Sequence, residues 1–178
     1  LDGALEEEKA ARVFVQAVLR NSERLSNLIA DLLDLSRIEA GHYEVLESRL
    51  NLHAIVHRVA ESVKHKLEMK EMVLEISVDE HLEALGDAQA LEQVLINLVE
   101  NGIKYTPKGG MFLLRAQAVS DRVRIEVHDN GPGIAPEHRP RIFERFYRVD
   151  PGRSKEMGGT GLGLAIVKHL VGAMNGEV

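Results

Sequence analysis

The sequence predicts an α+β fold, in which a helical segment precedes a two-layer α/β domain. Two observations predict it. Between about residues 6 and 40, apolar residues recur at alternating spacings of four and three, as in a helical heptad seam. After residue 43, stretches with helical spacing alternate with short stretches of period two, an order typical of a sheet covered by helices. We therefore expect two domains, residues 1–42 and 43–178.

The composition limits the classes of function. The chain has 178 residues, of which 44% are hydrophobic, and is long enough to bury a core. Its net charge of −6 disfavours nucleic-acid binding. The absence of cysteine excludes disulfides, thiolate chemistry and zinc–thiolate sites. No apolar stretch approaches the ~20 residues of a membrane span.

The first segment predicts one long helix that ends near Gly41. Residues 1–5 are typical of the tail of a preceding helix, so the two helices would form an antiparallel hairpin. A seam this wide needs a partner, and we expect the hairpin to dimerise into a four-helix bundle. The alternative is that the seam packs only against the second domain. The seam consists of Phe14, Val18, Asn21, Leu25, Leu28, Leu32 and Leu35, widened by Ile29 and Leu33.

The second segment predicts a mixed or antiparallel sheet covered on one face by helices. Asn51 and Asp87 are suited to cap two of these helices. We expect Gly176–Val178 to begin a further strand of a longer parent protein. The expected strands are 43–50, 72–78, 111–119 and 122–129, and the expected helices begin at 51, at 87, just after Pro136 and at 161, the last ending near 174.

A glycine-rich stretch, residues 158–163, precedes an apolar run with helical spacing. A flexible loop that leads into a helix presents free backbone N–H groups, which suit a phosphate. The spacing of Gly159, Gly161 and Gly163 matches neither a P-loop nor a dinucleotide fingerprint. A merely flexible loop remains the alternative.

Polar residues form a stripe on the otherwise apolar helix that begins at Asp87. Asn97 and Asn101 are four residues apart and share a face, and Lys104 lies beside Asn101. Amide oxygens suit Mg²⁺, and an ammonium group suits phosphate. The alternative is an ordinary solvated helix face.

Asp129 ends a strand in which Val123, Ile125 and Val127 mark the covered face. By that period Asp129 belongs to the same face, where a carboxylate needs a hydrogen-bond donor such as a purine amine. Gly131 and Gly133 follow and leave room for a flat base. An Asx turn that closes a loop is the local alternative.

Four stretches together resemble the N, G1, F and G2 boxes of bacterial sensor histidine kinases: Asn97–Tyr105, Asp129–Gly133, Arg141–Phe146 and Gly159–Gly163. The ATP-binding domain of these kinases shares its fold with gyrase, Hsp90 and MutL. Residues 23–41 resemble the second helix of the kinases' dimerisation hairpin. The resemblance implies a two-layer α/β sandwich of the GHKL ATPase type, with its last strands beyond Val178.

The resemblance also implies roles for individual residues. Asn101 would ligate Mg²⁺ with Asn97 beside it, Lys104 would contact phosphate, and Tyr105 would contact the nucleotide. Asp129 would accept from the adenine amine, with Gly131 and Gly133 along the base. Residues 150–158 would form a lid to which Arg153 or Lys155 contributes. The residues that would reach the phosphates are Arg148, Gly159, Thr160, Gly161, Leu162 and Gly163.

The implied activity is transfer of the ATP γ-phosphate to a histidine, for relay to a response-regulator aspartate. The implied cofactors are ATP and Mg²⁺, and the implied partners are a second copy of the chain and a receiver domain, with no nucleic acid. The expected location is the cytoplasm, whether or not the parent sensor is membrane-anchored.

None of the eight histidines stands in the acceptor context of the family, so we expect Mg-ATP binding without autophosphorylation. Gly102 is a second departure, because the family usually has alanine there.

Two other functions are open at this point. The first is a hydrolysing ATPase of the gyrase–Hsp90 type, whose members carry a glutamate base where this chain has Asn97. Glu100 is adjacent to Asn101 but points away from that face, which makes it a poorer base. The second is a dimerisation and regulator-docking module with an idle nucleotide site.

Overall fold

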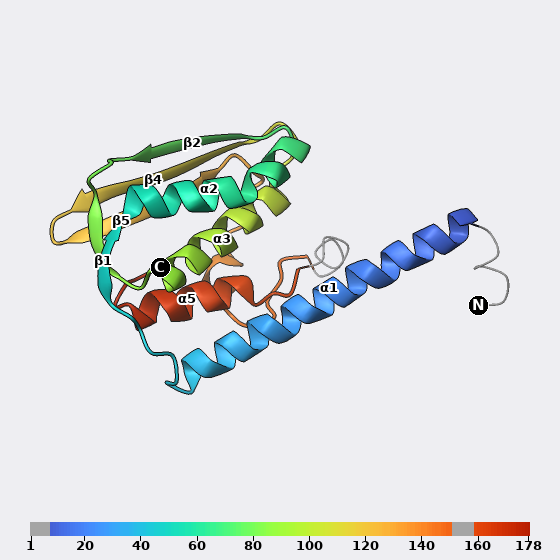
Figure 1. Cartoon of the computed structure of the whole chain (residues 1–178), viewed down its shortest axis with the longest axis horizontal. Coiled ribbons are helices and arrows are strands. Elements are labelled where there is room, and N and C mark those ends of the chain that lie inside the picture. The colour runs from blue at the N-terminus through green and yellow to red at the C-terminus, as the bar shows by residue number, and fades with distance from the viewer. Residues whose placement is uncertain (1–7, 151–158) are drawn as a thin grey trace.

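The structure is a computed structural model that describes residues 8–150 and 159–178. A long helix, α1, runs along one side of a domain in which helices lie beneath a sheet (Figure 1). The α+β class is confirmed. The elements are α1 (Glu8–Glu39), β1 (Ser48–Asn51), α2 (Leu52–Met69), β2 (Val73–Val78), β3 (Glu83–Gly86), α3 (Ala88–Tyr105), β4 (Met111–Val119), β5 (Arg122–Asp129), a short 3₁₀ helix (Arg139–Arg141) and α5 (Gly163–Ala173).

The main sheet is mixed, which is one of the two arrangements that the sequence predicts. Its order is β2-β4-β5, with β2 parallel to β4 and β4 antiparallel to β5. The parallel pair needs a crossover, and α3 supplies it on the way from β2 to β4. Strands β1 and β3 form a separate antiparallel pair.

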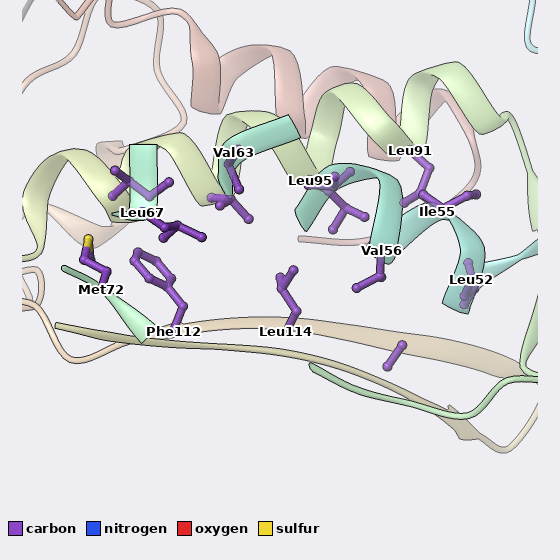
Figure 2. Packing of buried hydrophobic residues seen from close by; sticks show 14 of the residues in the cluster. Leu52, Ile55, Val56, Val63, Leu67, Met72, Leu91, Leu95, Phe112 and Leu114 are labelled. Atoms are coloured by element: carbon purple, nitrogen blue, oxygen red, sulfur yellow. The ribbon is translucent and has the colours of Figure 1, made fainter. Parts of the chain in front are cut away.

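One face of the main sheet carries the first hydrophobic core. Apolar side chains of α2 and α3 point toward Phe112 and Leu114 of β4 (Figure 2). The helical spacing seen in the sequence accounts for this, because it gives α2 and α3 each an apolar face toward the sheet. The buried members labelled in the figure are Leu52, Ile55, Val56, Val63, Leu67, Met72, Leu91, Leu95, Phe112 and Leu114.

A second core joins α3, α5 and α1. Leu35 of α1 is only 1% exposed and packs in one cluster with Val94, Leu162 and Ile166. Other members of the predicted seam remain open in the single chain: Phe14, Val18, Leu25 and Leu32 are each 45–59% exposed. The C-terminal part of α1 therefore packs against the domain, while most of its seam does not.

Several predicted strands need correction. The strand expected at 43–50 is confined to β1, because Leu46 donates its N–H to the Asp87 side chain instead of to a neighbouring strand. Strand β3 was not predicted, since its four residues are too few for a clear alternation. Gly176–Val178 have no regular structure, so the strand expected there is wrong for the residues present. The helix tail expected at 1–5 lies outside the described residues.

Candidate functional site

Helix α3 is the element around which the predicted site residues lie, and Asp87 fixes its start. Asp87 Oδ1 accepts from the N–H groups of Gln89 at 2.9 Å and Ala90 at 3.0 Å, as a helix cap does. Burial raises the pKa of this carboxyl, but the backbone hydrogen bonds outweigh burial and hold the pKa below its ordinary 3.8. The predicted cap is confirmed.

The two predicted asparagines lie against the first turn of α5. A Cβ built on Gly163 would be 3.4 Å from Asn97 Oδ1 and 4.0 Å from Asn101 Nδ2. Asn97 Nδ2 is buried and has no hydrogen-bond partner among the described residues. An unpaired buried amide costs about 1–3 kcal/mol, and this atom therefore points to a polar ligand between α3 and α5.

Positive charge gathers at the end of α3. A Cβ on Gly159 would be 2.1 Å from Lys104 Nζ and 3.9 Å from Arg148 Nη2, so the glycine allows both cations to approach the loop. Lys104 Nζ also lies 5.2 Å from the ring centre of Tyr105, which is 39% exposed. Burial lowers the pKa of Lys104 below 10.5; Tyr105 opposes this, and the charges of Arg148 and Arg24 add to it. An anion at this position would relieve both the burial cost and the repulsion.

Asp129 lies beyond the end of the same helix. Its Oδ1 accepts from Gly131 N–H at 2.8 Å and from the Thr106 hydroxyl at 3.3 Å. The Asx turn considered as an alternative is thus present, yet both bonds use one oxygen and neither uses Oδ2. A Cβ on Gly131 would be 2.6 Å from Asp129 Oδ1, so glycine is required there. Gly133 has φ +70 and open space around it.

The expected burial of Asp129 is wrong. Asp129 pairs with the fully buried Phe112 in the ladder, so it shares the covered face by register. It is nevertheless exposed, as the last residue of β5.

The glycine-rich loop is held from two sides. Gly161 has φ +77, and a Cβ on it would lie 3.0 Å from Phe146 Cα; the Phe146 N–H donates to the Gly161 carbonyl at 2.9 Å. On the other side, the Thr160 hydroxyl donates to Asp31 Oδ2 of α1 at 2.8 Å and accepts from Leu162 N–H at 3.2 Å. The loop is therefore positioned by the segment before it and by α1.

Asp31 is half-buried at this contact. Burial raises the pKa of its carboxyl above 3.8; the Thr160 hydrogen bond opposes this, and nearby Asp34 and Glu100 add to it. No local pattern in the sequence indicates this contact, because the two partners are 129 residues apart.

A second unpredicted residue, Lys70, lies behind the site. Its Nζ donates to the carbonyls of Ile103, Lys104 at 3.2 Å and Thr106 at 3.0 Å. One ammonium group thus caps the last turn of α3, which carries the residues facing the loop and Asp129.

The predicted lid, residues 150–158, lies outside the described residues apart from Asp150. The two cations expected there, Arg153 and Lys155, are among the residues that the structure does not describe. Their contribution to the site stays a prediction.

The profile of the family described as histidine kinase-, DNA gyrase B-, and HSP90-like ATPase matches residues 86–178. The chain belongs to this family. The sensor-like histidine kinase SenX3 of Mycobacterium tuberculosis is 35% identical to it over 175 residues, which are 97% of this chain and 42% of SenX3. The chain thus spans about two fifths of that relative.

Solved structures of histidine kinases agree with this assignment. Histidine kinase AdeS of Acinetobacter baumannii has a TM-score of 0.75 and 29% identity, over 90% of this chain and 73% of that one. Full-length ShkA in complex with AMPPNP has a TM-score of 0.79 and 35% identity, over 92% of this chain and 34% of that one. The resemblance to sensor histidine kinases is confirmed, and the chain contains an ATP-binding domain of the histidine kinase type. Within the described ranges, no helix is long and apolar enough to cross a membrane.

Proposed function

We propose that the chain is the ATP-binding catalytic core of a sensor histidine kinase, which transfers the γ-phosphate of ATP to a histidine for relay to a response-regulator aspartate. The observation that carries the proposal is the unpaired, buried Asn97 amide near Gly163, at one end of a glycine-rich loop whose other end, at Gly159, lies against Lys104 and Arg148. Phosphoryl transfer depends mostly on positioning and charge neutralisation, and this arrangement serves both.

The proposed roles follow from the contacts. Asp129 Oδ1 accepts from Thr106 and Gly131, and Oδ2 accepts from the adenine amine. Gly131 and Gly133 leave room for the base. Tyr105, partly exposed, contacts the nucleotide. Lys104 and Arg148 hold the phosphates. The backbone of the loop adds N–H donors from Gly159, Thr160, Gly161 and Gly163, while the Leu162 N–H already donates to the Thr160 hydroxyl and Leu162 contributes by position.

The amide oxygens fit Mg²⁺, which prefers hard oxygen ligands. Asn101 would hold the ion, and Asn97 lies one turn away on the same face of α3. Bound Mg²⁺ supplies charge neutralisation for the phosphates. The side chains of the chain itself orient the nucleotide and exclude water from it.

The remaining parts of the proposal concern assembly. We infer a boundary near residue 42 between a dimerising helical hairpin, residues 1–42, and the catalytic domain, residues 43–178. The exposed seam residues Phe14, Val18, Leu25 and Leu32 support a second copy of the chain as partner. A response-regulator receiver domain is the proposed downstream partner.

The hydrolysing ATPase is the weaker alternative. Glu100, which directly precedes Asn101 in the sequence, forms an ion pair with Lys66 of α2. A carboxylate held by a cation on that side is a poor base for water beside Asn97.

Isothermal titration with a non-hydrolysable ATP analogue, with and without Mg²⁺, tests the proposal. We expect binding by the wild-type chain and about tenfold or greater loss in Asp129→Asn, because an amide presents an N–H₂ group or a weaker acceptor to the adenine amine. Asp121→Asn, with the same change of charge on an exposed turn, is the matched control. No heat from the wild type, or equal affinity in Asp129→Asn, would contradict the proposal, and steady phosphate release would favour the ATPase.

A further inference from the structure

One face of α1 lies against the ATP-binding domain. Between residues 20 and 39, its less exposed residues gather on one face of the helix: Arg24, Leu28, Asp31, Asp34, Leu35 and Ile38. Two contacts fix this face. Leu35 is buried in the core shared with α3 and α5, and Asp31 accepts the hydrogen bond of Thr160 in the glycine-rich loop.

Arg24 lies on this face, two helical turns before Asp31. The separation of seven residues corresponds to about 10 Å along the helix axis. In Figure 1 the middle of α1 runs beside the chain that leads into α5, which agrees with the hydrogen bond from Thr160 to Asp31. The Arg24 side chain is therefore placed near the phosphate side of the proposed site, and it is half-buried.

Lys104, Arg148 and Arg24 bring three positive charges to this region, and none of the three has an acidic partner among the described residues. Burial lowers the pKa of Lys104, and the positive charges of Arg148 and Arg24 lower it further. Within residues 11–150 and 159–178, no carboxylate forms an ion pair with Arg24 or Arg148. Like charges gathered without counter-ions repel one another, and a polyphosphate would offset that repulsion.

We propose that Arg24 of α1 is a further residue of the nucleotide site, where it contributes a third positive charge to the polyphosphate group. Bound nucleotide is then held by α1 as well as by the domain that follows it. The inference rests on the proposed function, and it adds a residue from outside the four motifs. Asp31 has the supporting role: by accepting from Thr160, it holds the glycine-rich loop beside the same face of the helix.

Titrations of the full chain with an ATP analogue, ADP and adenosine test this inference. Arg24→Gln should weaken binding of the ATP analogue about tenfold, weaken ADP binding less, and leave adenosine binding unchanged, because adenosine has no phosphate. Arg24→Lys keeps the charge and should restore part of the loss. Arg37→Gln is the matched control, since Arg37 is an exposed residue on another face of the same helix.

The outcomes separate the two proposals. If the wild type binds the ATP analogue and Arg24→Gln binds it equally well, Arg24 is not in the site and the kinase assignment stands. If Arg24→Gln weakens adenosine as much as the ATP analogue, the residue has only a structural role, and the inference is wrong. If the wild type binds no nucleotide, both proposals fail.

Discussion

Gly102 lies in the buried face of α3, and a methyl group there would collide with the ring of Phe112. A Cβ built on Gly102 would be 2.1 Å from Phe112 Cε1 and 2.5 Å from Cζ, distances at which the ring must shift. The ring is 0% exposed and packed on all sides, so it has little room to move. The glycine, which departs from the alanine usual at this position in the family, is explained by the large aromatic residue opposite it.

Two effects of Gly102→Ala oppose each other. Alanine favours a helix interior by about 1 kcal/mol over glycine. Overpacking a well-filled core costs about 1–3 kcal/mol, and the very short distances to the ring place this case toward the upper end. We expect a net loss of about 1–2 kcal/mol in the free energy of unfolding, measured by urea denaturation.

A double-mutant cycle with Phe112→Leu separates the two effects. In the Phe112→Leu background the ring is gone, so Gly102→Ala should become neutral or stabilising by up to about 1 kcal/mol. The expected coupling energy is therefore about 1–3 kcal/mol. If Gly102→Ala stabilises the chain that retains Phe112, or if the two changes are additive, the clash does not determine the choice of glycine.

Three further changes test other contacts. Because the pKa of Asp31 is raised above 3.8, the carboxyl stabilises the fold below that pH and loses this contribution as the pH rises through the raised value. Asp31→Asn keeps an oxygen for Thr160, so its free energy of unfolding should exceed that of the wild type at pH 7, with a smaller difference near pH 4. Lys70→Met removes three donors from the end of α3 and should cost about 1–2 kcal/mol in urea unfolding, whereas Lys70→Arg should cost less. Gly161→Ala places a side chain at φ +77 and 3.0 Å from Phe146 Cα, which should cost about 1–2 kcal/mol and weaken binding of the ATP analogue; an unchanged affinity would show that the loop is not in the site.

The helices could be predicted from the sequence because their signals are local. Asn51 and Asp87 each accept from a backbone N–H in the next turn, and the apolar residues that follow repeat at the helical period. Strand β3 has no such signal. Its pairing with β1 joins residues that are about 35 positions apart, so it depends on the rest of the fold.

The candidate site could be predicted only in part for the same reason. Spacing along α3 predicted that Asn97, Asn101 and Lys104 share a region, and the structure places all three near the glycines of the loop. Their roles in binding stay predictions. Contacts such as Lys70 with the end of α3 involve an ordinary surface residue type at long sequence distance, and no local pattern distinguishes it.

The two faces of α1 explain why one helix can serve two proposed purposes. With about 100° of rotation per residue, the exposed seam of Phe14, Val18, Leu25 and Leu32 lies about a quarter-turn from the face that carries Arg24, Asp31 and Leu35. The heptad pattern predicted a single seam because Leu28 and Leu35 continue it at regular spacing. Leu35, however, is buried against the ATP-binding domain, and Leu28 is less exposed than Leu25 and Leu32 of the seam. A partner helix on the seam would therefore leave the face beside the glycine-rich loop in place, so that dimerisation and nucleotide binding can be altered separately by substitutions on the two faces.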